Sequence, residues 1–123
     1  MPELTPERMK QREIKFRAWD NVDYMSKPFT LNDIVHNRIS FASDATIMQY
    51  TGRKDEKDVE IYEGDIVRCG NGDIDKVEWG EHDACFNVSG YYSQSDDYPT
   101  MAFIEGGPFE VLGNVHQNPD LLK

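Results

Sequence analysis

The chain has 123 residues and a formal net charge of -10 at pH 7, from 23 Asp and Glu against 13 Lys and Arg. Its length is that of one domain, and 38% hydrophobic residues supply enough apolar surface for a core, which excludes a disordered acidic tail. A surface of this sign repels phosphate, so we do not expect general coating of DNA or RNA.

The first twelve residues are predicted to form an N-terminal arm or a short helix. Thr5 as the helix cap, Pro6 at the first helical position and Glu7 in the first turn favour a helix, and a frayed arm is the alternative. Basic residues gather in this part of the chain. Up to Pro28 there are six basic residues against five acidic ones, a net charge of +1 that leaves -11 for the rest.

Three elements are predicted between the arm and the middle of the chain. Residues 14–18 alternate apolar and charged side chains, the period of a half-buried strand. Residues 31–41 (LNDIVHNRISF) space their apolar residues in a way that suits either a short helix or a pair of strands. Residues 46–52 (TIMQYTG) are predicted as a strand. The charged residues 53–60 that follow are predicted as an exposed loop.

Turn signals divide the second half into short strands. In residues 61–69 (IYEGDIVRC), Gly64 is predicted to reverse the chain between two extended pieces. Residues 70–73 (GNGD) predict a hairpin, because Asn-Gly is the strongest short hairpin signal. Further strands are expected at residues 85–92 and 109–115. Asn118-Pro119 then breaks the last strand, and the leucines after it are expected to pack back on the sheet.

This pattern predicts a mainly β protein with little helix, built as a small and strongly bent antiparallel sheet or barrel. The one internal boundary is expected at the charged loop of residues 53–58. Apolar strand positions form the expected core. They are Phe16, Trp19, Ile66, Val67, Trp79, Phe86 and Val111.

Three ordered motifs span most of the chain: IKFRAWD at residues 14–20, MQYTGRKDEKDVEIYEGDIV at 48–67, and EVLGNVHQNPDLL at 110–122. Together they resemble the YopX family of phage and prophage proteins. The resemblance runs from Glu13 to Leu122 and departs from the usual pattern at two positions. Arg53 stands where an apolar residue is typical, and Asp58 stands where the family usually has Gly.

The resemblance implies an SH3-like small barrel with an additional N-terminal β lobe, self-association, and no established activity. On this basis residues 1–12 are the arm and residues 13–123 the YopX-like domain. Within that domain, residues 13–52 form the N-terminal lobe and residues 59–123 the SH3-like barrel. The resemblance implies no catalytic residues.

A candidate binding cluster lies in the central motif, where tyrosines flank charged turns, a composition typical of recognition surfaces. Its members are Tyr50, Lys54, Asp55, Tyr62, Glu63 and Asp65. The alternative is structural: half-buried strand tyrosines, and an Asp65 that caps the turn at Gly64.

Candidate metal and nucleophile sets are weak. Residues 71–75 begin like a calcium loop, but Lys76 and His82 occupy the positions that need Gly and a carboxylate. Cys69, His82, Cys85 and His116 lack the paired spacing of a zinc site, and Cys85 with either histidine is a poor nucleophile set. We therefore expect two free thiols, no metal, no cofactor and no enzymatic activity.

The predicted function is that of a non-enzymatic phage or prophage accessory protein that binds another host or phage protein or assembles with its own copies. The alternative is a nucleic-acid-associated regulator that uses a basic N-terminal segment. Its contacts would be Arg8, Lys10, Arg12, Lys15 and Arg17. With neither a signal peptide nor a membrane span in the sequence, the expected location is the cytoplasm of a bacterial host.

Overall fold

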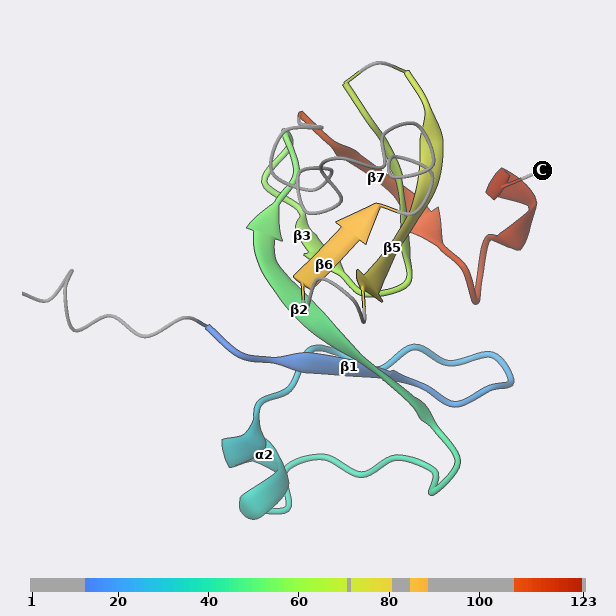
Figure 1. The fold of residues 1–123 in the computed structure, drawn as a ribbon. Coiled ribbons are helices and arrows are strands. Elements are labelled where there is room, and N and C mark those ends of the chain that lie inside the picture. The colour runs from blue at the N-terminus through green and yellow to red at the C-terminus, as the bar shows by residue number, and fades with distance from the viewer. Residues whose placement is uncertain (1–12, 71, 81–84, 89–107, 123) are drawn as a thin grey trace, which may run out of the picture.

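The computed structural model describes residues 13–70, 72–80, 85–88 and 108–122. Within them, seven strands form two antiparallel sheets, with one short α-helix between the first two strands and a 3-10 turn after the last strand. In Figure 1 the N-terminal lobe with α2 lies below and the four-stranded sheet above. The predicted arm at residues 1–12 lies outside the described residues, and no described helix is long and apolar enough to cross a membrane.

The first sheet has the order β1-β2-β3, with β1 at Phe16–Trp19, β2 at Thr46–Lys54 and β3 at Glu60–Tyr62. The first half of β2 pairs with β1, and its second half pairs with β3. The loop predicted over residues 53–60 is therefore shorter, because ladder pairing carries β2 on to Lys54 and starts β3 at Glu60. The strand β2 thus crosses from the lobe to the upper sheet (Figure 1).

The second sheet has the order β6-β5-β4-β7. Its strands are β4 (Asp65–Arg68), β5 (Ile74–Gly80), β6 (Cys85–Val88) and β7 (Glu110–Asn114). The β class and the hairpin between β4 and β5 are confirmed, with the Cys69 amide donating to the Asp73 carbonyl at 2.7 Å. A closed barrel is not detected, because β6 and β7 are the two edges and do not pair within the described ranges.

Gly64 forms the predicted turn between β3 and β4, with φ +88°. Its amide donates to the Val77 carbonyl, and its carbonyl accepts the Val115 amide. A Cβ at this position would lie 3.2 Å from the sulfur of Met48. Gly64 is required here both by its backbone angle and by the close approach of three segments.

The main core belongs to the second sheet and the strand that leads into it. It contains the buried residues Ile61, Val67, Cys69, Val77, Val88 and Phe109. The predictions for Trp19, Ile66 and Val67 are confirmed, and Phe16, Phe86 and Val111 are partly buried. The prediction for Trp79 is wrong: it is 46% exposed, because it lies at the end of β5, next to its last residue, Gly80. Its ring packs against that of Phe86 in a T-shaped arrangement, with centroids 5.0 Å apart.

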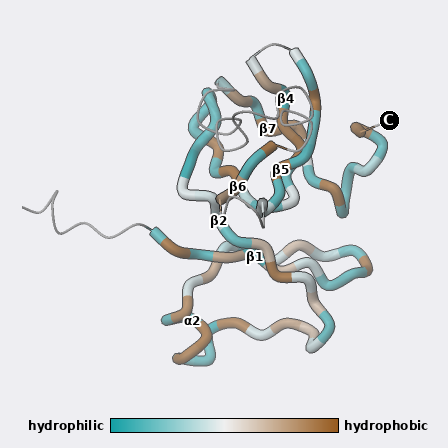
Figure 2. The backbone as a smooth tube through the Cα atoms, viewed as in Figure 1, coloured by the Kyte–Doolittle hydropathy of each residue, from teal (hydrophilic) through white to brown (hydrophobic). Residues whose placement is uncertain are grey.

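The segment that suited a helix or two strands forms the helix α2, Leu31–Val35. Thr30 caps its first turn, and the Asp33 carboxylate accepts the Thr30 amide in return, which is a capping box. None of the five helical residues is buried. Figure 2 shows α2 with hydrophobic colour at the outer end of the N-terminal lobe.

The division into residues 13–52 and 59–123 stays a prediction. The strand β2 contributes to both sides of it, since Tyr50 and Lys54 pair with Tyr62 and Glu60 of β3. The lobe is therefore linked to the second unit by a continuous strand as well as by side chains.

Candidate functional site

The six residues of the predicted binding cluster divide into two places. Tyr50, Tyr62 and Asp65 meet where β2, β3 and β4 converge, beside two basic residues in and just before β1. Lys54 and Asp55 lie at the far end of β2, and the side chain of Glu63 lines a groove between the two sheets. The structure therefore does not form one surface from the six.

The two tyrosines are buried and face each other across the β2–β3 pair, with ring centroids 5.5 Å apart. Lys15 lies over the Tyr50 ring at 5.0 Å, and Arg17 lies over the Tyr62 ring at 4.7 Å. The Tyr62 hydroxyl donates to Glu60 at 3.1 Å. Burial, followed by the negative charge of Glu60, raises the pKa of Tyr62. These rings are packed between cations and strands rather than presented to solvent.

Asp65 is buried, and both of its carboxylate oxygens have a partner. One carboxylate oxygen forms an ion pair with Arg17, and the other accepts the Tyr62 amide at 2.7 Å. Burial raises the pKa of Asp65, while the charge of Arg17 and the Tyr62 hydrogen bond act in the opposite direction. Because Arg17 belongs to β1 and Asp65 to β4, this pair ties the N-terminal lobe to the second sheet.

Asp55 is also a structural anchor. Its carboxylate accepts the backbone amides of Lys57, Val59 and Val111, so it closes the loop after β2 and attaches that loop to β7. Burial acts to raise the pKa of Asp55, but these three hydrogen bonds outweigh it and lower the pKa below its ordinary value. The neighbouring Lys54 is exposed and lies 3.6 Å from Asp58.

The C-terminal motif forms a second set of backbone contacts that the sequence did not assign. The side-chain oxygen of Asn114 accepts the amides of His116 and Gln117, and Asn118 accepts the Asn114 amide. A Cβ on Gly113 would lie 2.5 Å from the Asn118 side chain. The spacing of Gly113, Asn114 and Asn118 in the sequence is thus explained by one turn.

A groove of about 390 Å³ lies between the sheets. It lies between β2 and β5 and is bounded by the turn at Gly64 and by residues 115–122. Its apolar lining is Ile47, Met48, Val77, Val115, Pro119 and Leu122. Thr46, Glu63, Lys76, Glu78 and His116 supply the polar groups.

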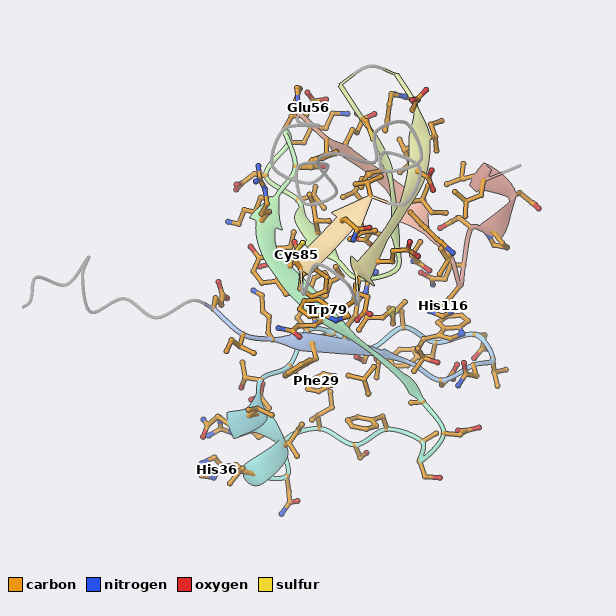
Figure 3. All side chains as sticks on the ribbon, in the orientation of Figure 1. Phe29, His36, Glu56, Trp79, Cys85 and His116 are labelled. Atoms are coloured by element: carbon orange, nitrogen blue, oxygen red, sulfur yellow. The ribbon has the colours of Figure 1, made fainter. Side chains whose placement is uncertain are left out.

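His116 lies at the side of the groove next to the lobe, stacked on Trp19 with ring centroids 5.7 Å apart (Figure 3). Burial, helped by the charge of Arg17, lowers the pKa of His116. Cys69 belongs to the core and Cys85 is partly buried; both thiols are free, while His82 lies outside the described residues. The described part of the chain contains no group of three His, Cys, Asp or Glu residues placed to hold a metal ion.

Comparison with known proteins identifies a family and solved structures of similar fold. The family described as YopX protein matches residues 21–123, which begins just after the IKFRAWD strand. The crystal structure of protein EF1440 from Enterococcus faecalis is similar in fold, with a TM-score of 0.56 and 22% sequence identity. That match covers 92% of this chain and 100% of EF1440. The search of functionally curated proteins finds no match.

Proposed function

The chain belongs to the YopX family, and we propose that it is a non-enzymatic phage or prophage accessory protein that acts by binding protein, in the first place a second copy of itself. Its expected location is the cytoplasm of a bacterial host. The proposal is carried by the outer face of α2, which consists of Leu31, Ile34 and Val35 and is called the α2 face below. Leu31 is 60% exposed and Val35 is 73% exposed.

A helix of this size needs packing from outside itself. Isolated helices shorter than about 12 residues are marginal in water, and helices in proteins gain most of their stability by burying an apolar face. The capping box stabilises α2 by about 1 kcal/mol, but none of its residues is buried. Contact of the α2 face with another molecule would supply the missing burial.

The distribution of charge favours a second copy at this surface. The N-terminal lobe, residues 13–52, has four basic and five acidic residues, a net charge of -1. Residues 53–123 have six basic and sixteen acidic residues, a net charge of -10. Two copies that met through their acidic halves would repel each other strongly, whereas two lobes carry little charge. A symmetric contact through the α2 face is therefore the arrangement with the least electrostatic cost.

The test is the mass of the protein in solution, by light scattering over a range of concentrations. The native chain should associate, and association should strengthen with salt, because screening reduces repulsion between the acidic halves. The double substitution Leu31→Ser and Val35→Ser should leave a monomer. Val22→Ser is the matched control, because Val22 is 78% exposed in the same lobe but lies outside α2. A native chain that is monomeric at every concentration and salt would contradict the proposal.

The alternative function, nucleic-acid association, gains no support from the described residues. Lys15 forms ion pairs with Glu13 and Glu60, and Arg17 forms one with Asp65. Both side chains therefore neutralise carboxylates of the same molecule instead of facing a phosphate. The other three basic residues of that hypothesis lie in residues 1–12, outside the described chain.

We also propose that the second sheet closes into an SH3-like barrel. The antiparallel run β4, β5 and β6, with β7 beside β4, is an arrangement from which an SH3-like barrel can be built. We expect the chain to close it between β6 and β7. Nuclear Overhauser contacts between amides of those two strands would establish closure, and their absence would leave an open sheet.

A further inference from the structure

We propose that the groove between the two sheets binds an extended segment of a partner protein that presents an apolar side chain beside a lysine or arginine. This inference rests on the proposed function only in that both are protein contacts, since the groove and the α2 face share no residue.

The base of the groove is apolar and firmly held. Met48 and Val77 are buried beneath it, and Ile47 and Leu122 stand at its rim, about 40% exposed. The Gly64 backbone bonds to both walls, through the Val77 carbonyl on one side and the Val115 amide on the other. A site that is already formed loses little conformational freedom on binding, and a volume of about 390 Å³ is within the range of protein binding pockets.

The charged side chains at the rim of the groove favour a positively charged occupant. Lys76 and Glu78 lie 3.8 Å apart and compensate each other. Glu63 receives one long hydrogen bond, from the Gln49 amide at 3.4 Å, and no Lys or Arg of the described residues lies within 4.0 Å of it. Burial lowers the pKa of His116, so its ring does not offset the Glu63 charge at neutral pH. Among the described residues, the groove therefore has one carboxylate without a basic partner beside an apolar base.

The rest of the molecule favours the same occupant. Residues 53–123, which supply most of the groove, carry a net charge of -10 and attract cations while repelling anions and acidic proteins. A second copy would bring its own acidic half against this half, so it is a poor occupant. The partner that fits is a segment that combines a positive charge with an apolar side chain.

The experiment is a titration of the full chain with three acetylated pentapeptides, in which the amide chemical shifts of the protein report binding. The first alternates Lys and Leu, the second replaces Lys with Glu, and the third replaces Leu with Ser. The Lys/Leu peptide should shift the amides of Gly64, Val77 and Val115. The Glu/Leu and Lys/Ser peptides should bind at least several-fold more weakly.

Two variants locate the site, and one variant is the control. Glu63→Gln should weaken binding of the Lys/Leu peptide about 2- to 5-fold, the range for a rim ion pair, and Leu122→Ser should weaken it about 5-fold. Glu56→Gln removes the same charge from an exposed loop residue away from the groove (Figure 3) and should have no effect. Equal weakening by Glu56→Gln, equal binding of the Glu/Leu peptide, or no shifts at the groove would overturn the inference.

The failure of this inference is distinguishable from failure of the proposed function. The double substitution Leu31→Ser and Val35→Ser should bind the Lys/Leu peptide as the native chain does. If the peptide fails to bind while the native chain still associates, the groove proposal alone is wrong.

Discussion

The two parts of the chain reach stability by different means. The second sheet and the strand β3 close one core, with Ile61, Val67, Val77 and Val88 essentially inaccessible to solvent. The N-terminal lobe buries Phe29 and Met48, but it leaves the α2 face exposed. It is attached to the second sheet by the shared strand β2 and by the Arg17–Asp65 pair. The difference is the basis of our proposal that the lobe completes its burial in an assembly, while the core beside the second sheet is already closed.

The largest expected effect comes from breaking the attachment. Arg17→Ala leaves Asp65 buried without its cation, which should reduce the free energy of unfolding by about 3–5 kcal/mol. Arg68→Ala is the control, because the Arg68–Glu110 pair is exposed and should cost at most about 1 kcal/mol. Urea unfolding measures both. Equal losses in the two variants would mean that Arg17 contributes no more than a surface charge.

A pair of truncations compares the two interiors directly. Ile61→Ala creates a cavity in the core that β3 and the second sheet share, and should cost about 2–5 kcal/mol. Leu31→Ala changes an exposed side chain and should change monomer stability by less than about 0.5 kcal/mol. Thermal unfolding at a concentration where the chain is monomeric provides the measurement. A large loss for Leu31→Ala under those conditions would show that the lobe has an interior of its own.

Asp55 should make the junction between the loop after β2 and β7 sensitive to acid. Because its folded pKa lies below the ordinary value, it stabilises the protein fully above that ordinary value of about 3.9 and loses this contribution as the pH falls through the folded pKa. Asp55→Ala should cost about 1–3 kcal/mol at pH 7, with the difference from the native chain shrinking below pH 4. A difference that is constant from pH 7 to pH 2.5 would contradict this role.

Substitution at Trp79, at the end of β5, should cost less than substitution in the core. Trp79→Ala removes a half-exposed ring and its edge contact with Phe86, so we expect a loss of about 1–2 kcal/mol instead of the cost of a core tryptophan. The same urea titration measures it. A loss above about 3 kcal/mol would show that Trp79 contributes to stability as a core residue does.

The smallest effect is expected in the loop between β2 and β3. Asp58 has φ +68°, a backbone conformation that glycine adopts without strain. Asp58→Gly should therefore raise stability, by less than about 1 kcal/mol, despite losing an exposed ion pair with Lys54. A decrease in the midpoint of thermal unfolding would show that the Asp58 side chain contributes more than its backbone strain costs.

Local signals in the sequence predicted much of the fold. Alternation at residues 14–18 marked β1, and Gly64 and the Gly-Asn-Gly-Asp run marked two turns, because these depend on neighbouring residues. The exposure of Trp79 could not be predicted from alternation, since it depends on where the core ends in three dimensions.

The candidate site was less predictable. The sequence identified Tyr50, Tyr62 and Asp65 as a cluster but not their partner Arg17, which lies 48 residues before Asp65. The groove combines residues of β2, β5 and the C-terminal turn, and no local pattern links these segments. Of its residues, the sequence indicated Glu63 as a member of the binding cluster and His116 as a member of a weak metal set. Whether the predicted cluster recognises a ligand stays a prediction, and its contacts within the fold assign structural roles to most of its members.

The central claim is that the α2 face is covered by a second copy, and amide hydrogen exchange at two protein concentrations tests it most directly. The amides of Ile34 and His36 donate to backbone carbonyls of the α2 turn, so their exchange reports opening of the helix. We predict that their protection rises as the protein is concentrated, while that of Val67 and Val77 in the second sheet does not change. Protection of α2 that is independent of concentration would contradict the account.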